Sequence, residues 1–141
     1  MKKSYFLLLT MLFILPITAM AQITPEWMRY PVVSPDGASI AFVYKGDVYR
    51  VGIDGGEAVR LTFQPEMDMQ PIWSPDGQKL AFASERNGNF DVFVMDATGG
   101  EATRLTYHSN NEVPLSFSAD GALVYFDAHR QDAVTNREYP T

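Results

Sequence analysis

Catalysis at neutral pH would depend first on the two histidines of the chain, His108 and His129. A histidine can serve as the base that a nucleophilic hydroxyl needs, and the members of such a triad meet in space rather than along the sequence. The Gly-x-Ser-x-Gly motif that sets a serine nucleophile on a sharp turn is missing, however. We therefore interpret both histidines as surface or loop residues and expect no catalytic residue in this chain.

The acidic residues raise a second kind of chemistry, metal binding. Glu66 and Asp68 lie in the stretch Gln-Pro-Glu-Met-Asp-Met, where they could bind calcium, although the spacing differs from that of an EF-hand loop. A solvated acidic loop is the simpler interpretation. Because the chain has no cysteine, thiolate metal sites, thiol catalysis and disulfides are excluded. We expect no metal and no other cofactor.

Three further aspartates occupy one position of a repeated phrase, which reads Ser34-Pro35-Asp36-Gly37, then Ser74-Pro75-Asp76-Gly77, and in altered form Ser118-Ala119-Asp120-Gly121. Proline presets φ at the second position of a tight turn, while aspartate and glycine tolerate the conformations that follow. An aspartate in such a turn also accepts hydrogen bonds from the backbone. These residues are therefore predicted to be structural turn residues.

The surroundings of the phrase repeat as well. Residues 31–44 align with residues 71–84, and residues 47–62 align with residues 91–106, which repeat Asp-Val, Gly-Gly-Glu-Ala and Arg-Leu-Thr. A period of about 40–45 residues is typical of a four-stranded propeller blade. A solenoid is the alternative, but solenoid repeats are usually shorter, and this favours the propeller.

Four short extended segments are expected in each unit. In the second copy they are residues 71–73, 79–84, 90–97 and 102–106, and in the first copy the hairpin at Lys45 and Gly46 is four residues shorter. Beyond residue 21, no run has the apolar spacing of an amphipathic helix. We predict an all-β chain, a partial β-propeller of about two and a half four-stranded blades, with blades at about 29–66, 67–110 and, in part, 111–141.

Several residues recur at matched places inside the units. Asp47 and Asp91 precede the third strand, where we expect them to cap the preceding loop by accepting backbone N–H bonds. Arg60 and Arg104 are expected to pair with acidic turns of a neighbouring blade. The aromatic residues are predicted to form the core between blades: Trp73, Phe82, Phe90 and Phe93.

The first 21 residues are predicted to be a cleavable signal peptide. Lys2 and Lys3 are followed by an apolar run over residues 5–17, and Ala19-Met20-Ala21 is a small-x-small cleavage site. The run is short for a membrane span, so an uncleaved anchor is the less favoured alternative. We expect an exported protein, periplasmic or secreted, with no stable membrane anchor after cleavage, and assign residues 22–141 to the incomplete propeller.

Composition narrows the range of partners. The chain has 46% hydrophobic residues and 13% aromatic ones, which indicates a globular protein rather than a disordered one. Its net charge is −6, and Lys2 and Lys3 lie in the leader, so the remainder is more acidic still. No basic stripe is available to neutralise phosphates, which argues against nucleic acid and anionic membrane surfaces as partners.

The sequence from Trp27-Met28-Arg29-Tyr30-Pro31 onward resembles the first propeller of exported tricorn-like serine peptidases, and the repeat is also similar to the units of TolB. The resemblance covers essentially the whole predicted mature chain. It implies a propeller that filters or guides peptides, followed in a longer protein by a second propeller, a PDZ-like module and a catalytic domain with the serine nucleophile. The alternatives are a TolB-like module that binds envelope proteins and a decayed gene fragment.

Too few blades are present to close a ring, since propellers usually have four to eight. The missing blades are expected either from a longer chain or from other copies of this one. Contacts with peptides or envelope proteins are expected at the loops 64–70, 85–89 and 107–112, because a propeller binds through its rims. Net acidity favours basic or neutral peptides there. The candidate contact residues are Glu66, Asp68, Arg86, Asn87, His108 and Glu112.

Overall fold

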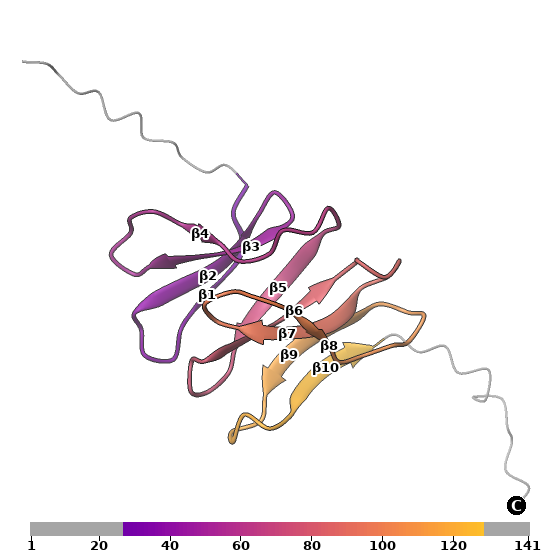
Figure 1. The fold of residues 1–141 in the computed structure, drawn as a ribbon. Coiled ribbons are helices and arrows are strands. Elements are labelled where there is room, and N and C mark those ends of the chain that lie inside the picture. The colour runs from indigo at the N-terminus through magenta and orange to yellow at the C-terminus, as the bar shows by residue number, and fades with distance from the viewer. Residues whose placement is uncertain (1–26, 129–141) are drawn as a thin grey trace, which may run out of the picture.

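The computed structural model describes residues 27–128, so the predicted signal peptide and His129 lie outside the described residues. This part of the chain contains ten strands and no helix (Figure 1). Among the described residues no helix is long and apolar enough to cross a membrane. The prediction of an all-β chain is confirmed.

The strands form two complete four-stranded antiparallel sheets and one pair. Blade 1 consists of β1 (Arg29–Val33), β2 (Ser39–Tyr44), β3 (Asp47–Gly52) and β4 (Val59–Arg60). Blade 2 consists of β5 (Asp68–Trp73), β6 (Lys79–Ser84), β7 (Asp91–Asp96) and β8 (Thr103–Arg104). The pair consists of β9 (Glu112–Phe117) and β10 (Val124–Ala128). Strands follow one another in chain order within each sheet, which is the meander of a propeller blade.

The three sheets lie side by side like the blades of an open fan (Figure 1). The first strand of each sheet, β1, β5 and β9, contacts its counterpart in the next sheet. These strands therefore form the inner row of a partial β-propeller, as predicted. The first strands of both complete blades are irregular at the same place, because Tyr30 and Gln70 have φ of 53° and 55° and the pairing register shifts there.

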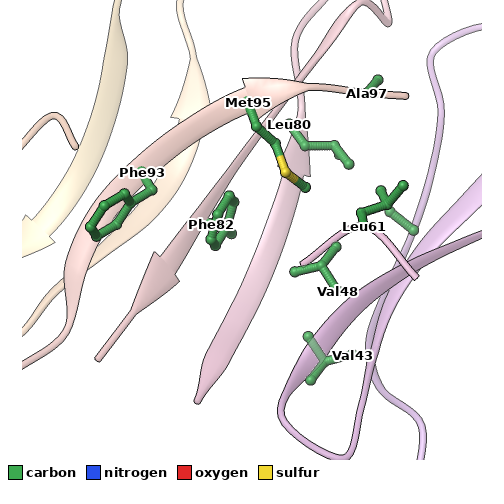
Figure 2. Close-up of a cluster of buried hydrophobic side chains, with 9 residues drawn as sticks. Val43, Val48, Leu61, Leu80, Phe82, Phe93, Met95 and Ala97 are labelled. Atoms are coloured by element: carbon green, nitrogen blue, oxygen red, sulfur yellow. The ribbon is translucent and has the colours of Figure 1, made fainter. Parts of the chain in front are cut away.

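The hydrophobic core lies between blades 1 and 2 (Figure 2). Val43, Val48 and Leu61 of blade 1 face a row of blade 2 side chains made of Leu80, Phe82, Phe93 and Met95. Phe82 and Phe93 stack at 6.1 Å between ring centroids. Half-buried Trp73 packs against this cluster and donates a hydrogen bond from Nε1 to the Val32 carbonyl oxygen over 3.1 Å. The interblade role predicted for Trp73, Phe82 and Phe93 is confirmed.

The Ser-Pro-Asp-Gly phrase closes the turn between the first two strands of each sheet. In blade 2 the Ser74 hydroxyl donates to Asp76 Oδ1 over 2.6 Å and accepts the Lys79 N–H over 2.9 Å, while Asp76 Oδ1 also accepts the Gln78 N–H over 3.0 Å. The same network recurs in the other two copies. Gly77 has φ of +69°, a left-handed conformation that glycine adopts without strain. The predicted turn role is confirmed.

The second hairpin of each blade differs in length. Two residues, Lys45 and Gly46, connect β2 to β3, whereas residues 85–90 connect β6 to β7. Lys45 and Gly46 both have positive φ, 51° and 90°, as a tight two-residue hairpin requires. The length difference is therefore confined to this hairpin, as the sequence predicts, and the paired strands keep the same register around it.

Candidate functional site

Each complete blade contains an ion pair between the start of its third strand and its fourth strand. Arg60 Nη2 lies 2.8 Å from Asp47 Oδ2, and Arg104 Nη2 lies 2.7 Å from Asp91 Oδ2. The hydrogen bond from Arg60 to Asp47 raises the pKa of Arg60 further above its usual value. The predictions that these aspartates cap loops and that the arginines pair with a neighbouring blade are wrong. The antiparallel pairing of the third and fourth strands places the two side chains together within one sheet.

The threonine of each Arg-Leu-Thr phrase completes the same structure. The Thr62 hydroxyl accepts the Val48 N–H over 2.9 Å, and the Thr106 hydroxyl accepts the Val92 N–H over 2.9 Å. Each arginine Nε donates to the threonine carbonyl oxygen, over 2.8 Å in blade 1 and 2.7 Å in blade 2. The phrase is therefore a clamp that secures the short outer strand to the third strand.

Two of the six candidate contact residues are buried rather than exposed on loops. Asp68 opens β5 and Glu112 opens β9, and the exposed fraction of both is 0%. Arg86 Nη2 lies 3.3 Å from Asp68 Oδ1, and its guanidinium lies 4.4 Å from the centroid of the Phe93 ring. The prediction that Asp68 and Glu112 lie on exposed loops is wrong, because each backbone N–H binds a carbonyl of the preceding blade, Gly46 and Phe90 respectively.

The other candidates differ in accessibility. Glu66 and Asn87 are exposed on their loops, whereas Arg86 is half-buried by its contacts with Asp68 and the aromatic rings. His108 is half-buried, and its Nδ1 accepts the Asn110 N–H over 3.1 Å. The structure therefore does not bring the six residues together as one surface. Within residues 27–128 no group of three or more His, Asp or Glu side chains is placed to hold a metal ion.

The long hairpin of blade 2 is fastened to the loop that leads into β9. Asn89 Nδ2 donates to the carbonyl oxygens of His108 and Asn110, both over 3.0 Å. The Phe90 N–H donates to Asn111 Oδ1 over 3.1 Å. In blade 1 the two-residue hairpin reaches its neighbouring segment through one backbone bond, from the Asp68 N–H to the Gly46 carbonyl oxygen over 2.7 Å.

A groove of about 760 Å³ opens beside this short hairpin. Its lining includes Trp27, Arg29, Tyr30, the hairpin, residues 64–69 and Phe90. Phe90, predicted to belong to the interblade core, is half-buried and lines this groove instead. Sequence reasoning missed the groove, although the shortened hairpin was its visible signal. We regard the groove as the candidate binding site and call it the hairpin groove.

The fold shows that the described part of the chain is a partial β-propeller. A comparison with protein families shows which family of propellers it belongs to. A family described as the tricorn protease N-terminal beta propeller domain matches residues 25–140. The chain belongs to this family.

Solved structures of related fold agree with the family. The chain is 26% identical to TolB from Acinetobacter baumannii, with a TM-score of 0.61 over 70% of this chain and 26% of that one. It is 22% identical to the tricorn protease, with a TM-score of 0.60 over 69% of this chain and 10% of that one. For puromycin hydrolase the identity is 24% and the TM-score 0.53, over 63% of this chain and 15% of that one. This chain therefore spans about a quarter or less of each of these structures. A comparison with curated proteins finds no match.

Proposed function

We propose that this chain is the non-catalytic N-terminal propeller segment of an exported serine peptidase of the tricorn kind, which guides or filters peptide substrates. The observation that carries the proposal is the family match over residues 25–140, which includes every described strand. The absence of a nucleophile elbow in the sequence supports a non-catalytic role. Proteolysis is assigned to a domain that this sequence does not contain.

Export is part of the proposal and is supported by the leader. Lys2 and Lys3, the apolar run over residues 5–17 and the Ala19-Met20-Ala21 site have the order of a secretory signal. The matched control for export is a variant of the source protein without residues 1–21. Cell fractionation should find the unmodified protein outside the cytoplasm and the variant inside.

The first experiment is to measure the mass of the native protein in the exported fraction of its source cells, with an antibody against the segment after residue 21. A species several times heavier than the 141-residue chain is expected, and it should react with a fluorophosphonate probe for active serines. A heavy species that does not react, or a species of the size of the cleaved chain, contradicts the peptidase proposal.

A second candidate function is a TolB-like module that binds other envelope proteins. The similarity to TolB from Acinetobacter baumannii, 26% identical over 70% of this chain, favours keeping it. Cross-linking in intact cells followed by mass spectrometry separates the two. Defined protein partners in the absence of serine-probe labelling support the TolB-like module, whereas labelling without such partners supports the peptidase.

A further inference from the structure

The hairpin groove exists because blade 1 lacks the long hairpin that, in blade 2, covers the loop leading into the next sheet. There the Asn89 amide and the Phe90 N–H hold residues 108–111 against the hairpin. Blade 1 has no residue equivalent to Asn89, since Lys45 and Gly46 alone connect its strands. The segment 64–67 is therefore not covered by a hairpin, and the groove stays open between it and residues 27–30.

Large apolar side chains form much of the lining. Trp27, Met67 and Tyr30 are 63%, 52% and 38% exposed, and Met69 and Phe90 lie on the same groove. A cluster of exposed aromatic and methionine side chains around a concave site is typical of a binding surface rather than of an ordinary loop. The groove is therefore suited to a large apolar side chain of a ligand.

Only some of the charged side chains that line the groove form ion pairs. The carboxylates of Asp47 and Asp68 are each paired with an arginine, Arg60 and Arg86. Among the described residues Arg29 forms no ion pair, and the Lys45 ammonium lies over the Tyr44 ring, 5.3 Å from its centroid. Glu66 is the one acidic side chain on this groove that forms no ion pair with a described residue.

Arg29 and Lys45 therefore give this groove a local excess of positive charge in an otherwise acidic chain. The corresponding place between blade 2 and β9 differs, because the residue aligned with Arg29 is Met69. An anionic group of a ligand would be favoured beside Arg29 and Lys45. The net acidity of the chain led us to expect a preference for basic or neutral peptides, but the local charge of the groove favours an anionic group. Two of the acids behind that expectation, Asp68 and Glu112, are buried.

We propose that the hairpin groove binds a peptide segment in which an acidic side chain adjoins a large apolar one. The apolar side chain packs against Trp27 and Met67, and the carboxylate lies between Arg29 and Lys45. The proposal rests on the proposed peptide-guiding function and names the class of peptide that the groove selects.

The test uses the purified protein and short fluorescent peptides that are acetylated at the N-terminus and amidated at the C-terminus. Four central pairs are compared by fluorescence anisotropy: Glu-Leu, Gln-Leu, Glu-Ala and Lys-Leu. We expect Glu-Leu to bind about three- to fivefold more tightly than Gln-Leu, with the difference decreasing as salt is raised. Replacing either cation, Arg29→Gln or Lys45→Gln, should remove a similar factor for Glu-Leu and leave Gln-Leu unchanged.

Two more variants make the result specific. Trp27→Ala should weaken Glu-Leu and Gln-Leu equally, because it removes the apolar contact. Lys79→Gln is the matched control. Lys79 is an exposed cation at the start of β6, beside the Ser74 turn, whereas Lys45 follows the end of β2, the corresponding strand of blade 1. It should change no affinity. Circular dichroism and thermal melts of each variant confirm that the fold is retained.

The outcomes separate this proposal from the proposed function. Equal binding of Glu-Leu and Lys-Leu, or affinities that Arg29→Gln and Lys45→Gln leave unchanged, overturn the groove proposal while peptide guiding stands. Binding only after the amidated C-terminus is replaced by a free carboxylate overturns it as well, because the terminal group is then the ligand. If no peptide of the panel binds, both the groove proposal and peptide guiding by this segment are contradicted.

Discussion

Asp91 and Asp47 occupy the same position in two blades but differ in their exposure to water. The exposed fraction of the Asp91 side chain is 0% and that of its partner Arg104 is 23%, whereas Asp47 and Arg60 are 11% and 39% exposed. Neither oxygen of Asp91 receives a hydrogen bond of good geometry within the described residues, so its charge is balanced by the nearby Arg104 guanidinium. Removing one partner of a buried pair leaves an uncompensated charge, which costs more than the pair itself contributes.

The substitution Arg104→Gln should therefore destabilise the protein by about 3 kcal/mol in its free energy of unfolding. Arg60→Gln removes the same group at the matched position and should have a smaller effect, because water screens the Asp47 carboxylate. Urea unfolding of both variants, followed by tryptophan fluorescence, measures the difference. Equal losses would show that burial of Asp91 does not determine the strength of the pair.

The aspartates of the Ser-Pro-Asp-Gly turns should respond to acid. The pKa of Asp76 lies below its usual 3.8, chiefly because the Ser74 hydroxyl donates a hydrogen bond to it, and Asp36 and Asp120 behave alike. Because the pKa is lower in the folded state, the stabilisation is present above the usual value and is lost as the pH falls through the folded pKa. Ser74→Ala should raise the pKa of Asp76 toward its usual value.

Carboxyl carbon NMR titration measures the Asp76 pKa directly. The control is Ser109→Ala, which removes an exposed hydroxyl outside the three turns. An unchanged Asp76 pKa in Ser74→Ala would mean that the Gln78 N–H, and not the hydroxyl, stabilises the carboxylate.

Among the structural elements, the hairpins explain both the success and the limits of sequence reasoning. The repeated turn phrase and the Arg-Leu-Thr phrase are local signals, so the strands, their order and the length difference at Lys45 and Gly46 could be predicted. The stretch around Asp68 has the composition of a polar loop, yet Asp68 begins a strand because its N–H binds the Gly46 carbonyl of another blade. The short hairpin beside the groove is visible in the sequence, but the segment that it leaves uncovered, residues 64–69, belongs to a later part of the chain, and no local pattern brings the two together.

Asn89 is expected to hold the long hairpin of blade 2 in place. Its amide donates to two carbonyl oxygens of the loop before β9, those of His108 and Asn110. Asn89→Ala should lower the free energy of unfolding by about 1–2 kcal/mol, since these acceptors lose a partly buried partner. Hydrogen exchange of residues 107–111 should also become faster.

Asn87→Ala is the matched control, because Asn87 is exposed in the same hairpin. It should leave both the stability and the exchange rates unchanged. If the two alanine variants behave alike, the hairpin is held by its backbone bonds, such as that between the Glu112 N–H and the Phe90 carbonyl oxygen.

For the molecule as a whole, matched leucines report how each blade is covered. Leu61 follows Arg60 in blade 1 and is 3% exposed, because it packs against blade 2. Leu105 follows Arg104 in blade 2 and is 42% exposed, because the sheet beside it has only two strands within the described residues. Leu123, which directly precedes β10, and Tyr125 on β10 are 60% and 54% exposed. An apolar surface of this kind favours contact with another element.

Tyr125→Lys should consequently have opposite effects in two contexts. In the 141-residue chain it places a charge on the exposed β10 strand, so self-association should decrease. In a longer protein whose next blade covers β10, the same change places a charge against apolar neighbours and should destabilise by about 2–3 kcal/mol. Analytical ultracentrifugation of the short chain and thermal unfolding of the longer protein measure the two effects.

Val59→Lys is the control for both, because Val59 remains 58% exposed although blade 2 is already in place. Unchanged stability of the longer protein carrying Tyr125→Lys would mean that β10 stays uncovered in the assembled protein, and the propeller would then be open at this strand.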